Sequence, residues 1–195
     1  MFRYFLVHKP FNYLSQFSKE VPEHLTLADI GDFPKEVYPV GRLDRDSEGL
    51  LLLTDDKKLN HTLLNPEFRH PRTYWVQVEG AITQKTLDEL RAGVDIRINK
   101  KTHRTLPAEV IILDDTSVLE ERDPPIRFRA NIPTTWIQLT LIEGKNRQVR
   151  RMCAKVGFPV LRLVRMSIGR LHLKEIARGA FVEIGREEVY EAFDF

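Results

Sequence analysis

The chain has 195 residues, of which 42% are hydrophobic and 30% are charged, and its formal net charge is +2 at pH 7. This composition is typical of a globular protein and excludes a disordered or fibrous one. A single cysteine excludes an internal disulfide and a multi-cysteine zinc site, and the scattered histidines favour no metal site. The sequence has no apolar run of membrane-spanning length and no secretory signal at its start. We therefore expect a cytoplasmic protein without membrane contact. The sequence has no signal for the oligomeric state, and we expect a monomer.

Patterns of apolar and turn-forming residues predict strands and helices that alternate irregularly. Expected strands cover residues 3–10, 37–44, 49–56, 73–80, 108–115, 135–144 and 158–169. Expected helices cover residues 26–30, 57–65, 83–93, 146–156 and 187–193, with threonine N-caps on the first and third. The order lacks the βαβ rhythm of a doubly wound sheet, so we predict an α+β fold with a mixed, mostly antiparallel central sheet and flanking helices. We expect a single domain, 1–195, with lobes of about 1–66 and 67–195.

Basic residues are concentrated in one part of the chain. Between residues 143 and 170 the only acid is Glu143, and the basic residues are Lys145, Arg147, Arg150, Arg151, Lys155, Arg162, Arg165 and Arg170. Such a basic stripe predicts contact with a phosphate backbone, and the alternative is a solvated basic face. The proline-rich segment 119–135 has no periodicity and is longer than an ordinary connection, which favours a functional loop or a surface hairpin.

The stretch GRLDRDSEGLLLLTDD, residues 41–56, places acidic side chains before a run of four leucines. One interpretation is a calcium loop, because Asp44, Asp46 and Glu48 alternate as they do in an EF-hand. However, Asp55 stands where that loop needs a bidentate Glu, and the following residues predict a strand instead of a helix.

Two other interpretations of this stretch remain open. Arg42 and Arg45 would form surface ion pairs with the acids, and such pairs contribute little to stability. Alternatively, a carboxylate at a turn before a buried strand is held rigidly enough for catalysis, and an arginine from elsewhere would lower its pKa. Arg147, Arg150 and Arg151 share one face of the expected helix and are the best candidates.

Four sequence blocks follow one another in the order found in one protein family. They are HKPFNYLSQF, GRLDRDSEGLLLLTDD, TYWVQVEG and EGKNRQVRRMCAKVGFPVLRLVRMSIG. In this order they resemble the ribosomal RNA pseudouridine synthases of the RsuA branch. The segments DRDSEG, PPIR and IPTTW most resemble the type E members, which act on the large ribosomal subunit. His8 and Asn12 depart from the Asn and Gly that are usual in the opening block.

The resemblance implies a pseudouridine synthase fold with two lobes around a catalytic cleft and no S4-like domain in front. It implies site-specific isomerisation of a uridine in ribosomal RNA, in 23S large-subunit RNA or an assembly intermediate. It also implies that the reaction needs no cofactor and no metal. The alternative is a non-catalytic RNA-binding factor for ribosome assembly, which would use the same basic residues without chemistry.

The resemblance also implies roles for individual residues. Asp44 matches the catalytic aspartate, which would attack ribose C1′ or remove the 2′ proton, and Arg150 matches the arginine expected to pair with it. Tyr74 matches the tyrosine that packs against the target base and takes part in proton transfer at C5. Leu161 matches an apolar wall of the pocket, although core packing would explain it nearly as well.

Five further residues are expected to bind RNA phosphates. For Arg150, a phosphate contact is the alternative to pairing with Asp44. The five are Lys9, Arg42, Lys145, Arg147 and Arg151.

Overall fold

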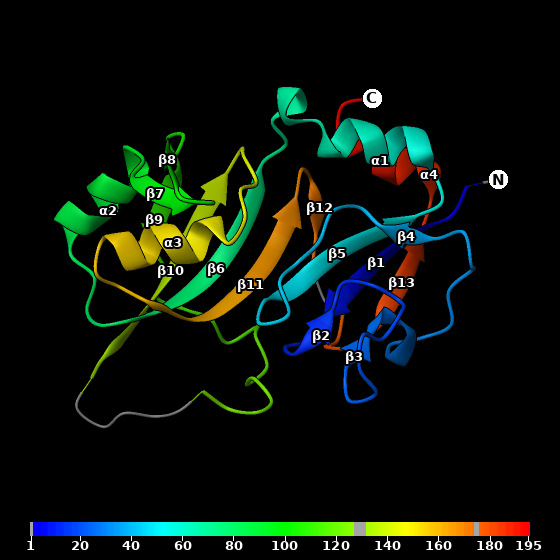
Figure 1. Cartoon of the computed structure of the whole chain (residues 1–195), viewed down its shortest axis with the longest axis horizontal. Coiled ribbons are helices and arrows are strands. Elements are labelled where there is room, and N and C mark those ends of the chain that lie inside the picture. Colours follow the sequence, from blue (N-terminus) through cyan, green and yellow to red (C-terminus); the bar gives the residue numbers. More distant parts are fainter. Residues whose placement is uncertain (1, 127–131, 174–175) are drawn as a thin grey trace. The chain divides into compact units, whose positions relative to one another are not determined.

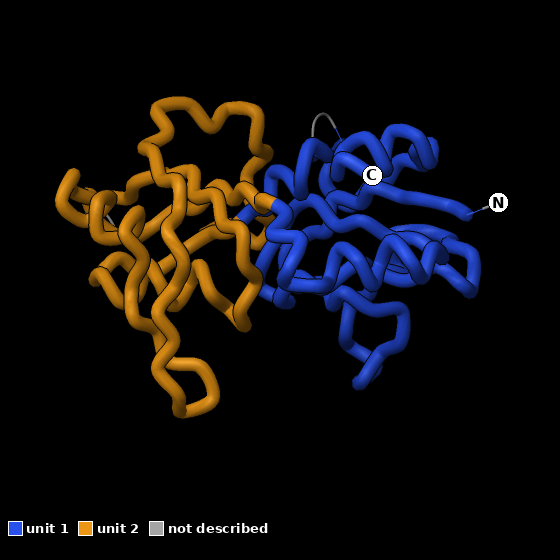
Figure 2. Tube along the Cα trace, turned by 90° about the horizontal axis from the view of Figure 1, so that it is seen from above, with its two compact units in different colours: residues 1–70, 164–195 blue, residues 71–163 orange. Residues whose placement is uncertain are grey.

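The computed structural model describes residues 2–126, 132–173 and 176–195. The chain forms two compact units (Figure 2): unit 1 comprises residues 1–70 and 164–195, and unit 2 comprises residues 71–163. Among the helices of these described ranges, none is long and apolar enough to cross a membrane.

Unit 1 is built on a largely antiparallel sheet (Figure 1). Its strands are β1 (Tyr4–Lys9), β4 (Tyr38–Pro39), β5 (Glu48–Thr54), the end of β11 (Val160–Ile168), β12 (Leu171–His172) and β13 (Phe181–Ile184). β1 pairs with β13 and β5, β4 with β5, and β12 with β11, all antiparallel, whereas β5 and β11 are parallel. A separate parallel pair consists of β2 (Tyr13–Leu14) and β3 (Leu25–Thr26). The helices are η1 (Leu27–Asp29), α1 (Lys57–Leu64), η2 (Pro66–Phe68) and α4 (Arg186–Glu191).

The four leucines of β5 explain why this strand lies at the centre of unit 1. All of them, Leu50 to Leu53, are 0% exposed, so both faces of the strand are covered. Leu51 and Leu53 join an apolar cluster with Phe5 and Val7 of β1. A strand that is buried on both faces reads as a continuous apolar run, which is the pattern of this sequence.

Unit 2 places two helices against a three-stranded antiparallel sheet of β6 (Arg72–Glu79), β10 (Thr134–Leu141) and β9 (Glu109–Ile112). The helices are α2 (Gln84–Arg91) and α3 (Gln148–Lys155), and β7 (Asp95–Ile98) and β8 (Lys101–Arg104) form a hairpin. Apolar residues of both helices join residues of β6 and β10 in one buried cluster, so both helices cover the same face of the sheet (Figure 1).

The sequence-based fold prediction is confirmed in its class: the protein is α+β with mostly antiparallel strands. The threonine N-caps are also present. Thr83 accepts a hydrogen bond from Thr86 N, and Thr26 forms a capping box with Asp29. Helix α3 begins at Gln148 and not near residue 146, because Arg147 has a left-handed φ of +50° that a helix does not accommodate.

Other details differ from the sequence-based expectations. Residues 164–195 belong to unit 1, because β13 pairs with β1 and the end of β11 pairs with β5. The hairpin of β7 and β8 was not expected, since its turn uses Asn99 and Lys100 at positive φ and has no glycine signal. Within the expected loop 119–135, residues 127–131 lie outside the described residues.

Asp56 connects three parts of unit 1 through one buried carboxylate. Its Oδ1 accepts hydrogen bonds from Lys58 N and Leu59 N, both at 3.1 Å, and so caps α1. Its Oδ2 accepts from Tyr4 Oη at 2.9 Å and from Tyr190 Oη at 2.8 Å. Burial alone would raise the pKa of this carboxyl, but the four hydrogen bonds outweigh burial and the pKa lies below its usual value.

We expect Asp56→Asn to lower the free energy of unfolding by about 2 kcal/mol near pH 7, because hydrogen bonds to a charged group contribute ~1.5–3 kcal/mol. A native pKa below the unfolded value of about 3.9 means that the carboxylate stabilises the fold above that pH. Its contribution is lost as the pH falls through the native pKa. Urea denaturation near pH 7 and about pH 3 measures this, with exposed Asp32→Asn as control. An Asp56→Asn effect of equal size at both pH values would contradict the assignment.

Candidate active site

The loop of residues 41–47 connects β4 to β5 and carries Asp44. The Asp44 carbonyl accepts a hydrogen bond from Ser47 N at 3.0 Å, which closes a tight turn. Gly49 follows with a φ of +106°, and a side chain there would come within 2.3 Å of the Arg165 carbonyl oxygen. Only glycine permits this close approach of β5 to β11. The half-buried side chain of Asp44 thus stands just before a strand that is closely packed against β11.

Ser15 holds the residue that precedes Asp44. Its hydroxyl donates to the Leu43 carbonyl oxygen at 2.9 Å and accepts from Leu43 N at 3.0 Å. Leu43 and Ser15 are both buried, at 7% and 5% exposure. The backbone next to Asp44 is therefore fixed on both of its polar groups. Sequence reasoning did not single out Ser15, and the only available signal was its place in the opening block.

Lys9 is completely buried at the end of β1, with 0% exposure. Its Nζ donates to the carbonyl oxygens of Pro10 at 2.9 Å, Tyr13 at 2.7 Å and Arg45 at 3.5 Å. This position corrects the expectation that Lys9 binds RNA phosphate, because no surface of the side chain is open to a ligand. Instead, Lys9 joins the opening block to the loop that carries Asp44.

Asn12 makes a second connection between the same two segments. Its backbone N donates to the Arg45 carbonyl oxygen at 2.8 Å, and its Oδ1 accepts from Arg45 Nε at 2.6 Å. Asn12 has a φ of +69°, a conformation that asparagine tolerates better than other non-glycine residues. Asn12, which stands where the opening block usually has glycine, therefore keeps a positive φ and adds a side-chain hydrogen bond to Arg45.

Gln148 organises the loop that leads into α3 in unit 2. Its Oε1 accepts from Lys145 N at 2.9 Å, and its Nε2 donates to Glu143 Oε1 at 2.7 Å. The same Glu143 oxygen accepts from Leu106 N at 2.8 Å, and Glu143 Oε2 lies 3.1 Å from His103 Nε2. Glu143, the single acid of the basic stripe, thus holds this loop in place, a role that the sequence did not predict.

The three arginines of α3 have different environments. Arg147 is exposed at the N-cap, and Arg150 is half-buried. Arg151 donates to Asn146 O at 3.0 Å, to Asn146 Oδ1 at 3.1 Å and to the Arg97 carbonyl oxygen. These contacts use the Arg151 guanidinium to hold the loop before α3, and its expected phosphate contact stays a prediction.

The basic stripe of the sequence does not form one basic surface. Arg162 is 6% exposed and donates to the Glu120 carbonyl oxygen at 2.9 Å, and Arg165 is 4% exposed and donates to Leu50 O at 2.8 Å. Arg170 pairs with Asp194 at 2.7 Å. Long-range contacts therefore bury Arg162 and Arg165, whereas Arg170 stays exposed and pairs with an acid.

Tyr74 and Leu161 are half-buried strand residues of unit 2. Tyr74 faces Leu139 across the β6–β10 pair and packs against the cluster that contains Val76 and Val78. This packing is the structural role considered for Tyr74 from the sequence. Its expected contact with the target base stays a prediction.

The predicted site residues are divided between the units. Lys9, Arg42 and Asp44 belong to unit 1, and Lys9 lies close enough to Asp44 for a coulombic interaction. The other six, Tyr74, Lys145, Arg147, Arg150, Arg151 and Leu161, belong to unit 2. The pairing of Arg150 with Asp44 stays a prediction.

A calcium loop from Asp44 to Asp55 does not fit the structure. Strand β5 occupies most of this stretch, and its residues from Glu48 to Thr54 are all buried. Within residues 2–126, 132–173 and 176–195, no three His, Cys, Asp or Glu side chains gather in a group that would hold a metal ion.

The comparisons with known proteins agree on one family. The family model described as RNA pseudouridylate synthase matches residues 3–155, and the chain belongs to this family. The ribosomal large subunit pseudouridine synthase E of Vibrio vulnificus (strain CMCP6) is 52% identical over 179 residues, 92% of this chain and 74% of that protein. The synthase E of Xanthomonas axonopodis pv. citri (strain 306) is 50% identical and covers 88% of each chain.

A solved structure supports the fold as well as the family. A protein described as a pseudouridylate synthase superposes with a TM-score of 0.80 and 27% sequence identity, over 98% of this chain and 74% of that one. The predicted fold, the family and the resemblance to type E members are thereby confirmed.

The buried ammonium of Lys9 predicts a pH dependence of stability. Burial lowers its pKa to about 7, although the carboxylates of Glu48, Asp46 and Asp44 act to raise it. The unfolded chain keeps a lysine pKa of about 10.4, so between these values the folded state binds fewer protons than the unfolded one. Stability therefore rises with pH in this window, by up to ~1.4 kcal/mol per unit.

We expect the free energy of unfolding of the wild type, relative to Lys9→Met, to increase from about pH 6 to about pH 9. Methionine fills a similar volume without the charge. Urea denaturation at intermediate pH values measures the difference, and exposed Lys35→Met serves as the control. Parallel profiles for wild type and Lys9→Met would show that Lys9 titrates as it does in the unfolded chain.

Proposed function

We propose that this protein converts one uridine of large-subunit 23S ribosomal RNA to pseudouridine. The observation that carries the proposal is the position of Asp44 in a member of the pseudouridylate synthase family. Asp44 directly follows Leu43, whose backbone N–H and carbonyl are both hydrogen-bonded to the Ser15 hydroxyl. Relatives about half identical to the chain are named large-subunit synthases, which supports the choice of RNA.

The reaction exchanges one glycosidic bond for another without any added group. The N1–C1′ bond breaks, the uracil turns, a C5–C1′ bond forms, the hydrogen at C5 leaves, and N1 gains a proton. Asp44 provides the carboxylate, either as a nucleophile at C1′ or as the base that removes the 2′ proton. The buried carbonyl-bound Lys9 and the Ser15 contact hold the backbone around this carboxylate, so little reorganisation is needed during the reaction.

Tyr74 and Arg150 are the other catalytic residues of the proposal, on the four-block resemblance. Tyr74 would pack against the target base and take part in proton transfer at C5, and Leu161 would contribute an apolar wall. Arg150 would keep the catalytic carboxylate ionised. The target uridine must leave its stack, which costs a few kcal/mol and least where the RNA is already loop-like.

Exposed cations would bind the RNA backbone. Arg42 follows Gly41 in the Asp44 loop, and Lys145 and Arg147 lie at the start of α3, and all three are exposed. Phosphate contacts of this kind supply affinity that weakens as salt increases. Lys9 holds backbone carbonyls instead and positions the Asp44 loop, and Arg151 would add a phosphate contact from its half-buried position beside the loop before α3.

We expect Asp44→Asn to abolish turnover while it leaves RNA affinity within about two-fold, because the amide neither attacks C1′ nor accepts the 2′ proton. The measurement uses unmodified large-subunit RNA that carries tritium at C5 of uridine, since isomerisation releases this hydrogen to water. Wild type should release close to one equivalent per RNA. Release by Asp44→Asn at the wild-type rate would remove Asp44 from the mechanism, and no release by wild type from any ribosomal RNA would favour a non-catalytic RNA-binding factor.

Tyr74→Phe separates packing against the base from proton transfer. If the hydroxyl takes part in proton transfer, we expect kcat for tritium release to fall by about 100-fold or more with KM nearly unchanged, because the ring remains. Tyr74→Leu should in addition raise KM. Full activity of Tyr74→Phe would leave packing as the role of Tyr74 and contradict proton transfer.

A further inference from the structure

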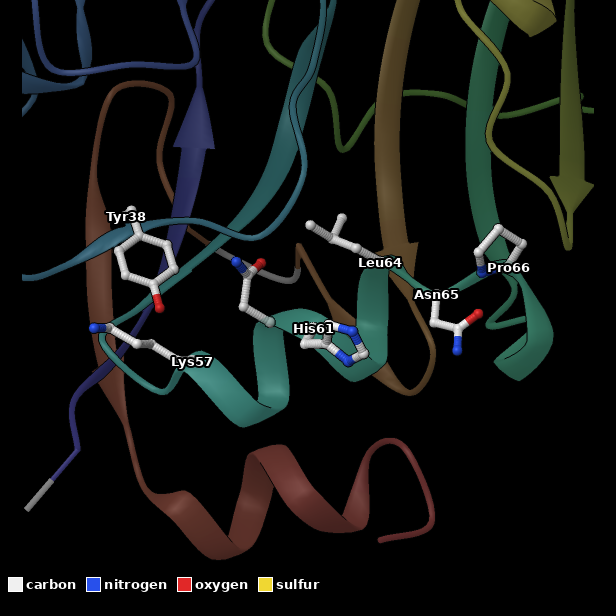
Figure 3. Close-up of a pocket in the computed structure, with 7 residues that line it drawn as sticks. Tyr38, Lys57, His61, Leu64, Asn65 and Pro66 are labelled. Atoms are coloured by element: carbon white, nitrogen blue, oxygen red, sulfur yellow. The ribbon is translucent and has the colours of Figure 1, made fainter.

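Unit 1 has a groove that the proposed catalytic residues do not use. It has a volume of about 580 Å³, is largely open to solvent, and is lined by Tyr38 of β4, by Lys57, Asn60, His61 and Leu64 of α1, and by the corner that follows α1 at Asn65 (Figure 3). We call it the α1 groove. Its volume falls in the ~300–1,000 Å³ range of small-ligand sites.

The α1 groove is formed by the face of α1 that does not pack into the core. Lys57, Asn60 and Leu64 stand at i, i+3 and i+7 and so share one face of the helix. The opposite face contributes Leu59 and Leu63 to the interior, at 2% and 3% exposure. Because the buried face already anchors the helix, the groove residues are available for a ligand.

The polar groups of the α1 groove suit a nucleotide. Asn60 lines the groove, and its Oδ1 is covered and has no hydrogen-bond partner among the described residues, so a ligand N–H would satisfy it once the half-buried side chain rotates toward the groove. Burial, together with the charges of Asp56 and Asp55, raises the pKa of Tyr38, which keeps its ring uncharged as a surface for a base. Figure 3 shows Tyr38 beside Lys57 at one end of the groove.

Among the described residues, the lining of the α1 groove contains one lysine, Lys57, and no acidic residue. Helix α1 has no acidic residue and carries Lys57, Lys58 and His61. Of the neighbouring acids, Asp56 accepts four hydrogen bonds and Asp55 accepts one from Arg3 N at 2.8 Å, and neither carboxylate lines the groove.

The α1 groove also adjoins the loop of the proposed catalytic carboxylate. A side chain on Gly41 would lie 3.3 Å from Leu64 Cδ2, so the groove wall contacts the first residue of the GRLD stretch. Asp44 stands three residues further along the same short loop. The groove and the proposed catalytic carboxylate are therefore connected through one short loop of unit 1.

We propose that the α1 groove is an RNA subsite that holds a nucleotide flanking the target uridine. The base lies against Tyr38 and Leu64, Asn60 accepts a hydrogen bond from the base edge, and Lys57 binds the phosphate. This inference rests on the proposed function, because it assigns part of the RNA to unit 1. It makes the groove a contributor to site selection, since a base-edge contact discriminates among nucleotides whereas a phosphate contact does not.

The test compares three variants on the same helix: Lys57→Ala, Asn60→Ala and, as a matched control, Lys58→Ala. Lys58 is exposed and loses the same charge but does not line the groove. Alanine has the highest helix propensity, so all three variants should fold. Tritium release from large-subunit RNA gives kcat and KM, and filter binding of the same RNA at several salt concentrations gives Kd independently of turnover.

We expect Lys57→Ala and Asn60→Ala each to raise KM and Kd by about ten-fold with kcat unchanged. Lys57→Ala should also reduce the slope of log Kd against log salt by about one, whereas Asn60→Ala and Lys58→Ala should leave it unchanged. The inference is overturned if wild type turns over and the two groove variants behave like Lys58→Ala. Wild type that binds the RNA but releases no tritium would instead refute the proposed function, and the Kd values would still decide whether the groove contacts RNA.

Discussion

The buried ammonium of Lys9 is the interaction on which the arrangement of the Asp44 loop depends. An ammonium without water is costly unless its donors are satisfied, and here three backbone carbonyl oxygens from two segments satisfy it. Neither segment can therefore move without leaving a buried amino group that lacks hydrogen-bond partners. Asn12 and Ser15 add contacts between the same segments, and together they turn a short loop into a rigid support for one carboxylate.

In unit 2, a neutral and an acidic side chain fix the loop that leads into α3. Gln148 and Glu143 share a buried hydrogen-bond network that sets the start of α3, and Arg151 holds the preceding loop from the outside. The helix itself is anchored by the buried Val149 and Met152. In both units, hydrogen-bonded groups away from the surface fix the segments that carry the exposed or half-buried side chains of the predicted site.

Arginine has two uses in this protein, and the sequence does not separate them. Arg162 and Arg165 extend inward to carbonyl oxygens, while Arg42 and Arg147 remain exposed. The side chain has a long apolar stem and several donors, so it serves both positions. A nucleic-acid surface inferred from a linear run of cations is for this reason larger than the surface that the fold provides.

The sequence by itself determined the elements whose signals are local. The leucines of β5, the threonine caps and the ordered family blocks predicted the strands, the helices, the family and the candidate residues such as Asp44. Only the tertiary structure decided that Lys9 lies inside, that Ser15 and Gln148 hold the loops, and that residues 164–195 join unit 1. These features depend on burial and on pairing between residues far apart in the chain, and no local pattern records which distant partner a side chain or strand will meet.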